Sequence, residues 1–116
     1  MKYLILILIL TTGFAVSTRA QEKPLPQSEY RSHIDKTATL CDIVYEVKII
    51  SDTVTNLYMG GNHTNAKFTI AIKGNKIQLD LANIKGKQLC VTGVLQLYKN
   101  TIQVIAAQPN QITITK

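Results

Sequence analysis

The stretch that decides the fold is GKQLCVTGVLQLYKN, residues 86–100, followed closely by IQVIAA, residues 102–107. Both runs are rich in the β-branched and apolar residues that favour strands, and the polar pair Lys99-Asn100 separates them. This pattern predicts two long strands joined by a tight turn, with a short coda over residues 108–112. It is the clearest β-hairpin in the chain.

Three more strands are predicted upstream of this hairpin. Residues 38–50 are dominated by leucine, isoleucine, valine and tyrosine, and residues 56–59 form a shorter run that ends at the turn signal Gly60-Gly61-Asn62. Residues 66–73 alternate with period two, which is typical of a half-buried strand. The apolar side of this alternation consists of Phe68, Ile70 and Ile72, and the other side consists of Lys67, Thr69, Ala71 and Lys73.

The segment between the third and fourth strands is apolar but short. It carries Ile77, Leu79, Leu81 and Ile84, for which we expect one or two helical turns. Five strands with a connector after the third are the layout of the OB-fold, a small Greek-key barrel that removes exposed strand edges by closing on itself. We therefore predict an all-β, five-stranded OB-fold barrel over residues 38–116, with a short helical connector between strands three and four.

The N-terminal segment has the layout of a secretory signal peptide. Met1-Lys2 gives a positive start, an apolar run extends from Tyr3 to Val16, and the small residues Thr18 and Ala20 precede the expected cut. The run is shorter than the roughly 20 residues of a membrane-spanning helix, although an uncleaved anchor is the alternative. We predict a signal peptide over residues 1–20, a flexible leader over residues 21–37, and a periplasmic or secreted domain.

The net charge of the domain does not by itself indicate a function. Cleavage after residue 20 removes Lys2 and Arg19 from the 13 basic residues and leaves all 7 acidic ones, so the net charge falls to about +4. A mildly basic domain is compatible with a polyanionic partner. The same surplus is also what solubility alone requires of a small domain.

The two cysteines, Cys41 and Cys90, are the only ones in the chain. Their spacing excludes a redox Cys-x-x-Cys pair, and together with His33 and His63 they match no zinc-ligand pattern. In an exported protein one disulfide is the natural inference. Such a bond closes a loop of about 49 residues and contributes about 4 kcal/mol on the chain-entropy model.

Strand alternation raises an objection to this bond. The apolar set of the fourth strand turns Cys90 outward, and that set consists of Leu89, Val91, Leu95 and Leu97. The odd-numbered set of the first strand turns Cys41 inward, together with Ile43, Tyr45 and Val47. Side chains on opposite faces cannot be bridged. A bulge in the first strand would reverse the facing of its early residues and remove the conflict.

Several short motifs point to a family. They are Gly86-Lys87, Leu89-Cys90-Val91-Thr92-Gly93, Leu97-Tyr98-Lys99, Pro109, Gln111-Ile112, Leu57-Tyr58-Met59-Gly60, Asn65 and Phe68-Thr69. Residues 38–113 resemble the small bacterial OB-fold domains related to the tRNA-anticodon-binding type, which occur alone behind a signal peptide or beside thermonuclease-like domains. Cys41 stands where that family has a cysteine opening its first strand. Lys73 departs from the pattern, because it replaces an aromatic residue.

The titratable residues do not predict an enzyme. The acidic side chains of Asp42, Glu46, Asp52 and Asp80 are scattered over strands and loops, and neither histidine has an obvious catalytic partner. His63 lies in a glycine-rich turn, which we interpret as a solvated loop position. We expect no catalytic activity, no cofactor and no metal.

Binding is the better hypothesis. OB-folds bind ligands on the face of strands two and three, between the first–second and fourth–fifth loops, and single-stranded nucleic acid stacks its bases on aromatic rings while basic groups contact its backbone. The resemblance therefore implies low-specificity binding of single-stranded DNA or RNA. The side chains expected to bind are Tyr58, Lys67, Thr69, Lys73, Tyr98 and Lys99.

Ordinary structural roles compete with this interpretation. Tyr58 also fits a cross-strand packing partner, and the lysines also fit a solvated face. A second hypothesis is a cell-envelope module that binds a protein partner or a small ligand without any nucleic-acid role. Export favours this second hypothesis, and fold alone does not choose between the two.

Overall fold

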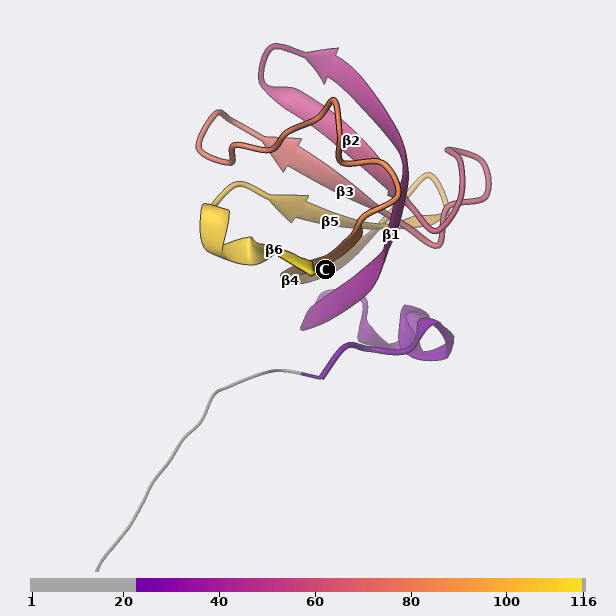
Figure 1. Ribbon diagram of the computed structural model, residues 1–116. Helices are drawn as coiled ribbons and strands as arrows, with labels where there is room; N and C mark the ends of the chain where they lie inside the picture. The colour runs from indigo at the N-terminus through magenta and orange to yellow at the C-terminus, as the bar shows by residue number, and fades with distance from the viewer. Residues whose placement is uncertain (1–22, 116) are drawn as a thin grey trace, which may run out of the picture.

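The computed structural model describes residues 23–115, so the predicted signal peptide lies outside the described residues (Figure 1). The elements are almost entirely strands. The strands are β1 (Thr37–Ser51), β2 (Val54–Met59), β3 (Phe68–Lys73), β4 (Gln88–Tyr98), β5 (Thr101–Ala106) and β6 (Ile112–Thr115). The helical segments are the 3-10 turns η2 (Gln27–Glu29), η3 (Arg31–His33) and η4 (Pro109–Gln111). No helix of the described part is long and apolar enough to cross a membrane.

Strand pairing closes five of the strands into a ring. The order β1-β2-β3-β5-β4 returns to its start because β4 also pairs with β1, and β6 adds to β4 as a sixth strand. All pairs are antiparallel except β3 and β5, which run parallel. The all-β prediction is confirmed. The coda after β5, which was not predicted to be a strand, contributes β6.

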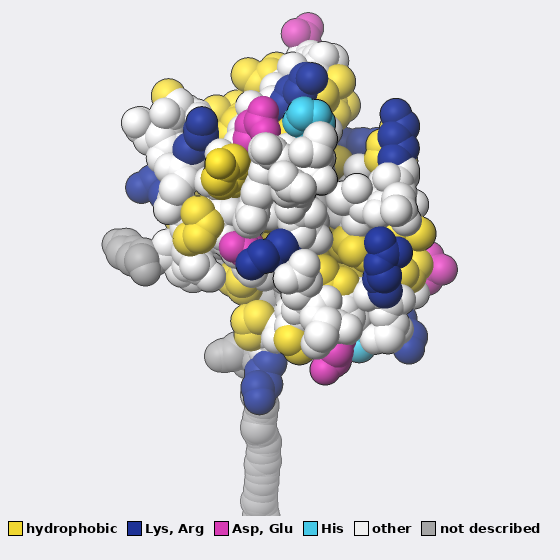
Figure 2. Space-filling view, turned by 90° about the vertical axis from the view of Figure 1, so that its right-hand side faces the viewer, with side chains coloured by type: hydrophobic (Ala, Val, Ile, Leu, Met, Phe, Trp, Pro, Cys, Tyr) yellow, Lys and Arg dark blue, Asp and Glu magenta, His cyan; other side chains and the backbone are white. Residues whose placement is uncertain are grey.

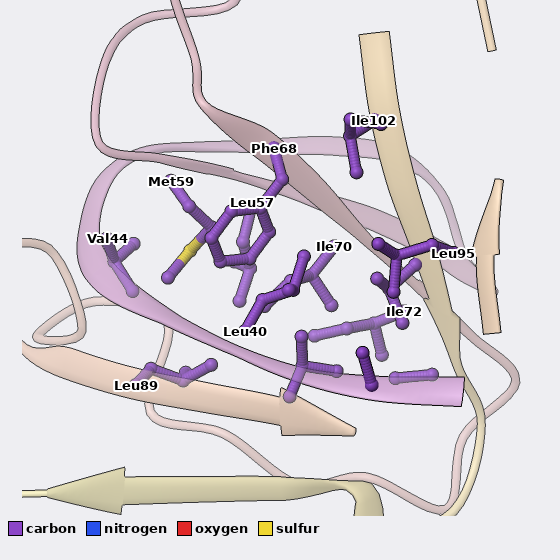
Figure 3. Packing of buried hydrophobic residues seen from close by; sticks show 14 of the residues in the cluster. Leu40, Val44, Leu57, Met59, Phe68, Ile70, Ile72, Leu89, Leu95 and Ile102 are labelled. Carbon is purple, nitrogen blue, oxygen red and sulfur yellow. The ribbon is translucent and has the colours of Figure 1, made fainter. Parts of the chain in front are cut away.

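The ring encloses one hydrophobic core (Figure 3). Each strand contributes its inward side chains, as period-two alternation requires. The fully buried set includes Leu40, Leu57, Met59, Phe68, Ile70, Leu89, Val91, Leu95 and Val104. Leu97 was expected in this set but is 48 % exposed. Pairing of β4 with β1 extends only as far as Val94, so Leu97 lies at the rim of the ring, beyond the cover of β1.

The early part of β1 has the opposite phase to the one predicted, whereas Val47, which was also predicted to point inward, packs against the core. Its inward residues are Leu40 and Val44, whereas Ile43 and Tyr45 are exposed, Tyr45 by 56 %. The register of β1 on β2 shifts between Val44 and Glu46, where one extra residue enters β1. The predicted inward placement of Cys41, Ile43 and Tyr45 is therefore wrong. Apolar residues occupy both odd and even positions of this strand, so alternation alone does not show which side faces the core.

Because the early part of β1 has this phase, Cys41 faces outward like Cys90 and the two can be bonded. Cys41 and Cys90 are register partners on the outer face of β1 and β4, with their Cα atoms 4.0 Å apart, and they are bonded to each other. Beside them the hydroxyls of Thr39 and Thr92 hydrogen-bond at 2.7 Å. The predicted bond is confirmed, and the expected objection from alternation disappears. The outer surface formed by Thr39, Cys41, Cys90 and Thr92 is called the disulfide face below.

The connector between β3 and β4 is not helical. Within residues 74–87 the chain forms turns and extended segments, while Ile84 is fully buried and the half-buried Ile77, Leu79 and Leu81 pack against the core. Ile77, Leu79 and Leu81 follow one another at intervals of two residues, which suits an extended chain lying on the core and not a helix. The predicted helical connector is wrong.

Packing begins ahead of residue 38, the start that the sequence assigned to the domain. The Tyr30 ring is 4 % exposed and meets the Phe68 ring edge-on, with centroids 5.8 Å apart. The backbone N–H of Leu25 donates to the carbonyl of Thr39 at 2.8 Å. Burial, together with the negative charge of Asp42, raises the pKa of the Tyr30 hydroxyl to about 12. Residues 25–36 are thus part of the packed structure.

A single side chain secures the corner between β5 and β6. The amide oxygen of Gln111 accepts from the backbone N–H groups of Ala107 and Gln108, at 2.9 and 3.0 Å. Its amide nitrogen donates to the carbonyls of Thr92 and Ile105, at 3.1 and 3.2 Å. This one side chain thus satisfies two backbone N–H groups and two carbonyls, and its bond to Thr92 ties the corner to β4.

Candidate ligand-binding groove

An open groove of about 500 Å³ lies on the outer face of β2, β3 and β5, on a different part of the ring from the disulfide face. This volume is in the range of small-ligand sites. The strand residues lining it include Asn56 and Tyr58 from β2, Thr69, Ala71 and Lys73 from β3, and Gln103 from β5. The β4–β5 turn and the β2–β3 loop supply further side chains.

Two small residues make the floor of the groove. Thr69 and Ala71 point away from the core, because alternation turns Phe68, Ile70 and Ile72 inward. They are nevertheless only 7 % and 3 % exposed. Their register partners on β2 are the larger Tyr58 and Asn56, and Gln103 of β5 is paired with Thr69 on the other side. Small residues between larger ones produce the trough.

One end of the groove is formed by Tyr58 and His63. Their rings are 6.1 Å apart and inclined by 59°. The loop that carries His63 is fixed by the Asn62 side chain, whose oxygen accepts from the backbone N–H of Thr64 and of Asn65, both at 3.1 Å. The backbone N–H of His63 donates to Glu46 at 3.2 Å. His63 was interpreted as a solvated loop residue, and the structure places it on the groove.

The β4–β5 turn brings Tyr98 and Lys99 to the same groove. Lys99 and Asn100 have φ values of 50° and 67°, a left-handed pair typical of a two-residue hairpin turn. The Lys99 ammonium lies 5.4 Å from the centre of the Tyr98 ring, a cation–π arrangement. Arg31 donates to the carbonyl of Asn100 at 3.2 Å, so the N-terminal segment contacts this turn.

The described lining of the groove combines lysine, histidine, amide, hydroxyl, tyrosine and aliphatic side chains, and it contains no carboxylate. Its cationic side chains are Lys73 and Lys99, and the floor between them is uncharged. Figure 2 shows lysine and arginine side chains over one side of the molecule, interspersed with acidic ones. The groove therefore suits an anionic ligand that also carries uncharged polar and apolar parts.

Five of the six predicted binding residues meet at this groove, namely Tyr58, Thr69, Lys73, Tyr98 and Lys99. Lys67 is not in its lining. The Lys67 ammonium pairs instead with the Asp42 carboxylate at 3.3 Å, next to the bend at Gly60. Lys67 precedes β3, and its N–H donates to the carbonyl of Met59 at the end of β2.

The amide side chains of Asn56 and Gln103 were missed. Gln103 reaches the groove through the parallel pairing of β5 with β3, a contact between segments far apart in the sequence. Only the pairing of β3 with β5 places Gln103 beside Thr69. Asn56 was detectable from the alternation with Tyr58 on β2.

The described residues do not form a metal-binding site. No three histidine, cysteine, aspartate or glutamate side chains there are gathered closely enough to hold an ion. Both cysteines are consumed by the disulfide. The chemistry available at the groove is stacking, hydrogen bonding and attraction of negative charge.

Comparisons with known proteins identify the fold but no family. No protein-family model and no curated protein matches this chain. A solved chain described as "OBody AM3L09 bound to hen egg-white lysozyme" is similar, with a TM-score of 0.58 at 10 % identity over 84 % of this chain and 98 % of that one. Another, "OBody AM1L10 bound to hen egg-white lysozyme", has a TM-score of 0.57 at 11 % identity over 87 % and 98 %. At such identities the similarity concerns the fold alone.

Proposed function

We propose that this protein binds single-stranded nucleic acid in the groove over β2, β3 and β5, without catalysis and without a cofactor. The observation that carries the proposal is the combination of two tyrosines and two lysines around an uncharged floor, with no carboxylate in the described lining. Stacking on aromatic rings and neutralisation of phosphates are the two interactions that hold single strands. Duplexes present no free base faces to such a groove.

Each part of the ligand has a matching part of the groove. The ammonium groups of Lys73 and Lys99 suit phosphates, because both side chains are exposed and the charges remain hydrated. The rings of Tyr58 and Tyr98 offer faces for bases. The floor at Thr69 and Ala71 excludes phosphate, because a charge buried there would have no opposite charge to compensate its desolvation.

We propose further that the ring is an OB-fold barrel and that the protein acts outside the cytoplasm. The closed order of five strands, the parallel β3–β5 pair and the similarity to the OBody chains support the first proposal. The disulfide and the N-terminal sequence support the second, because disulfides persist in oxidising compartments. The ligand would then be environmental or released DNA or RNA.

Fluorescence anisotropy with a labelled oligonucleotide of about 15 nucleotides tests the proposal. We expect binding at about 50 mM salt that weakens by about sevenfold or more at 200 mM, since two lysine–phosphate contacts give a logarithmic salt slope of about −1.4. A lack of binding to both DNA and RNA at low salt would contradict the proposal. It would favour the envelope module that binds a protein or a small ligand.

Two lysine variants separate the groove from general surface charge. Lys99→Ala removes a groove cation, whereas Lys67→Ala removes the same charge from the Asp42 ion pair outside the groove. We expect Lys99→Ala to reduce both the affinity and the salt slope, and Lys67→Ala to change the slope little. Equal effects of the two variants would indicate binding to diffuse positive charge and not to this groove.

A further inference from the structure

The floor of the groove carries a hydroxyl that is not hydrogen-bonded to any of the described residues. Thr69 is the buried polar residue of the described chain, at 7 % exposure, and it lines the middle of the groove. Within the described residues nothing hydrogen-bonds to its hydroxyl, whereas Thr39 and Thr92 on the disulfide face bond to each other. A buried polar group without a partner is unfavourable and calls for a specific explanation. A ligand group that bonds to this hydroxyl supplies one.

Two amide side chains lie on the strands beside the groove floor. Gln103 is its register partner on β5, and Asn56 is paired with Ala71, the next outward residue along β3. Both line the groove, and neither side chain is hydrogen-bonded to another described residue. An amide offers donors and an acceptor together, and a hydroxyl offers both as well. The floor thus presents a mixed set of unused donors and acceptors within the span of three neighbouring strands.

This set matches the edge of a nucleobase better than any other part of a nucleic acid. Phosphates carry only acceptors and belong with Lys73 and Lys99 at the rim. Base edges carry fixed patterns of donors and acceptors, which amide and hydroxyl side chains read. Tyr58 is the register partner of Thr69 on β2, so its ring stands beside the same position and offers a stacking face.

We propose that Thr69, Gln103 and Asn56 form a base-reading position on the groove floor, at which one base of the bound strand is recognised by its edge. The inference rests on the proposed function. Phosphate contacts and stacking hold a strand whatever its sequence, and this position adds a preference for one base. Each well-matched base-edge contact discriminates by roughly five- to 150-fold. The chain therefore prefers one base over at least one other by about tenfold or more.

Anisotropy titrations of the whole mature chain with homopolymers of dA, dC and dT, each about 15 nucleotides long, test this inference. We expect the wild type to prefer one homopolymer by about tenfold, and Thr69→Val to reduce that preference to about threefold or less while the salt slope is unchanged. Val retains the shape of Thr and removes only the hydroxyl. The matched control is Thr113→Val, which removes an exposed hydroxyl on β6 outside the groove and should keep the preference.

Two further measurements keep the test decisive. If Thr69→Val does not fold, Gln103→Leu on the half-exposed edge of the floor replaces it, with the same expected loss of preference. The RNA homopolymers rA, rC and rU should show the same base order as DNA. Equal affinity for all bases, a preference that survives both variants, or discrimination by sugar alone would overturn the base-reading position while leaving nucleic-acid binding intact. Absence of any binding would instead contradict the proposed function itself.

Discussion

The two outer faces of the ring differ in whether their polar side chains are already bonded to other described residues. On the disulfide face, Thr39 bonds to Thr92, Cys41 is bonded to Cys90, and all the hydrogen-bonding capacity of the nearby Gln111 amide oxygen and nitrogen is directed to backbone groups. On the groove face, the side chains of Asn56, Thr69 and Gln103 make no such bonds within the described residues.

This difference separates side chains that hold the fold from side chains left over for a ligand. Both faces follow from the same alternation of the strands, so periodicity alone does not distinguish them. What distinguishes them is whether each polar group already has a partner, because a satisfied group gains little from a ligand and an unsatisfied buried group gains much. Substitutions on the disulfide face should therefore affect stability, and substitutions in the groove should affect binding.

The largest loss of stability is expected from removing the disulfide. Cys41→Ala with Cys90→Ala frees a loop whose ends are 49 residues apart, and we expect the free energy of unfolding to fall by about 4 kcal/mol. Urea unfolding monitored by far-UV circular dichroism measures this change. A loss below about 1 kcal/mol would show that the disulfide face is held by its hydrogen bonds and packing, and not by the covalent link.

Gln111 should give the next largest effect. Gln111→Ala leaves four backbone groups, at the β5–β6 corner and on β4, without this partner, and we expect a loss of about 3 kcal/mol. Gln111→Glu retains the acceptor for Ala107 and Gln108 but loses the donor to Thr92 and Ile105, so it should also destabilise the fold. Thermal unfolding of both variants checks the prediction, and a wild-type midpoint for Gln111→Ala would refute it.

The raised pKa of Tyr30 predicts a loss of stability at alkaline pH. The folded-state pKa of about 12 lies above the unfolded value of 10.0, so the folded chain retains a proton that the unfolded chain releases. The contribution of Tyr30 to stability is complete below pH 10 and is lost as pH rises from 10 to 12, by about 2 kcal/mol at pH 12.

Tyr30→Phe isolates this effect from other groups that titrate in the same range. It keeps the edge-on contact with Phe68 and has no proton to release, so its stability should fall less steeply between pH 10 and pH 12 than that of the wild type. Urea midpoints at a series of pH values provide the comparison. Parallel curves for the two proteins would mean that the Tyr30 hydroxyl ionises as freely in the folded state as in the unfolded chain.

The smallest effect on stability, and the largest on binding, is expected in the groove. Tyr58→Ala should lower affinity for single-stranded DNA by roughly five- to 150-fold, the value of one stacked base, while the free energy of unfolding changes by about 1 kcal/mol or less. Tyr45→Ala is the matched control, since Tyr45 is an exposed strand tyrosine outside the groove lining. A similar loss of affinity in both variants would remove the distinction between the two surfaces.

The sequence predicted the class of the fold better than its details. The hairpin of β4 and β5 and the alternation of β3 were readable because apolar and polar residues alternate cleanly there. The phase of β1 was not, since Ile43 and Tyr45 are as apolar as Leu40 and Val44. The inward parity also changes at the register shift after Val44, beyond which Val47 packs against the core. The connector was misread as helical because its apolar residues pack on the core in extended form.

The candidate site was predictable to the extent that it follows from local pattern. Tyr58, Thr69 and Lys73 are outward residues of single strands, and Tyr98-Lys99 mark a hairpin turn. Gln103 joins them only through the parallel contact of β5 with β3, which no local pattern contains. The ion pair that removes Lys67 from the groove likewise depends on Asp42, which lies on another strand.

Chemical-shift mapping of the ¹⁵N-labelled chain with unlabelled dT oligonucleotide is the most direct test of which face carries the ligand. We predict that the backbone amides of Asn56, Tyr58, Thr69 and Gln103 shift on titration, whereas those of Thr39, Cys41 and Thr92 do not. Shifts confined to the disulfide face, or none at all under low salt, would contradict the assignment of the groove.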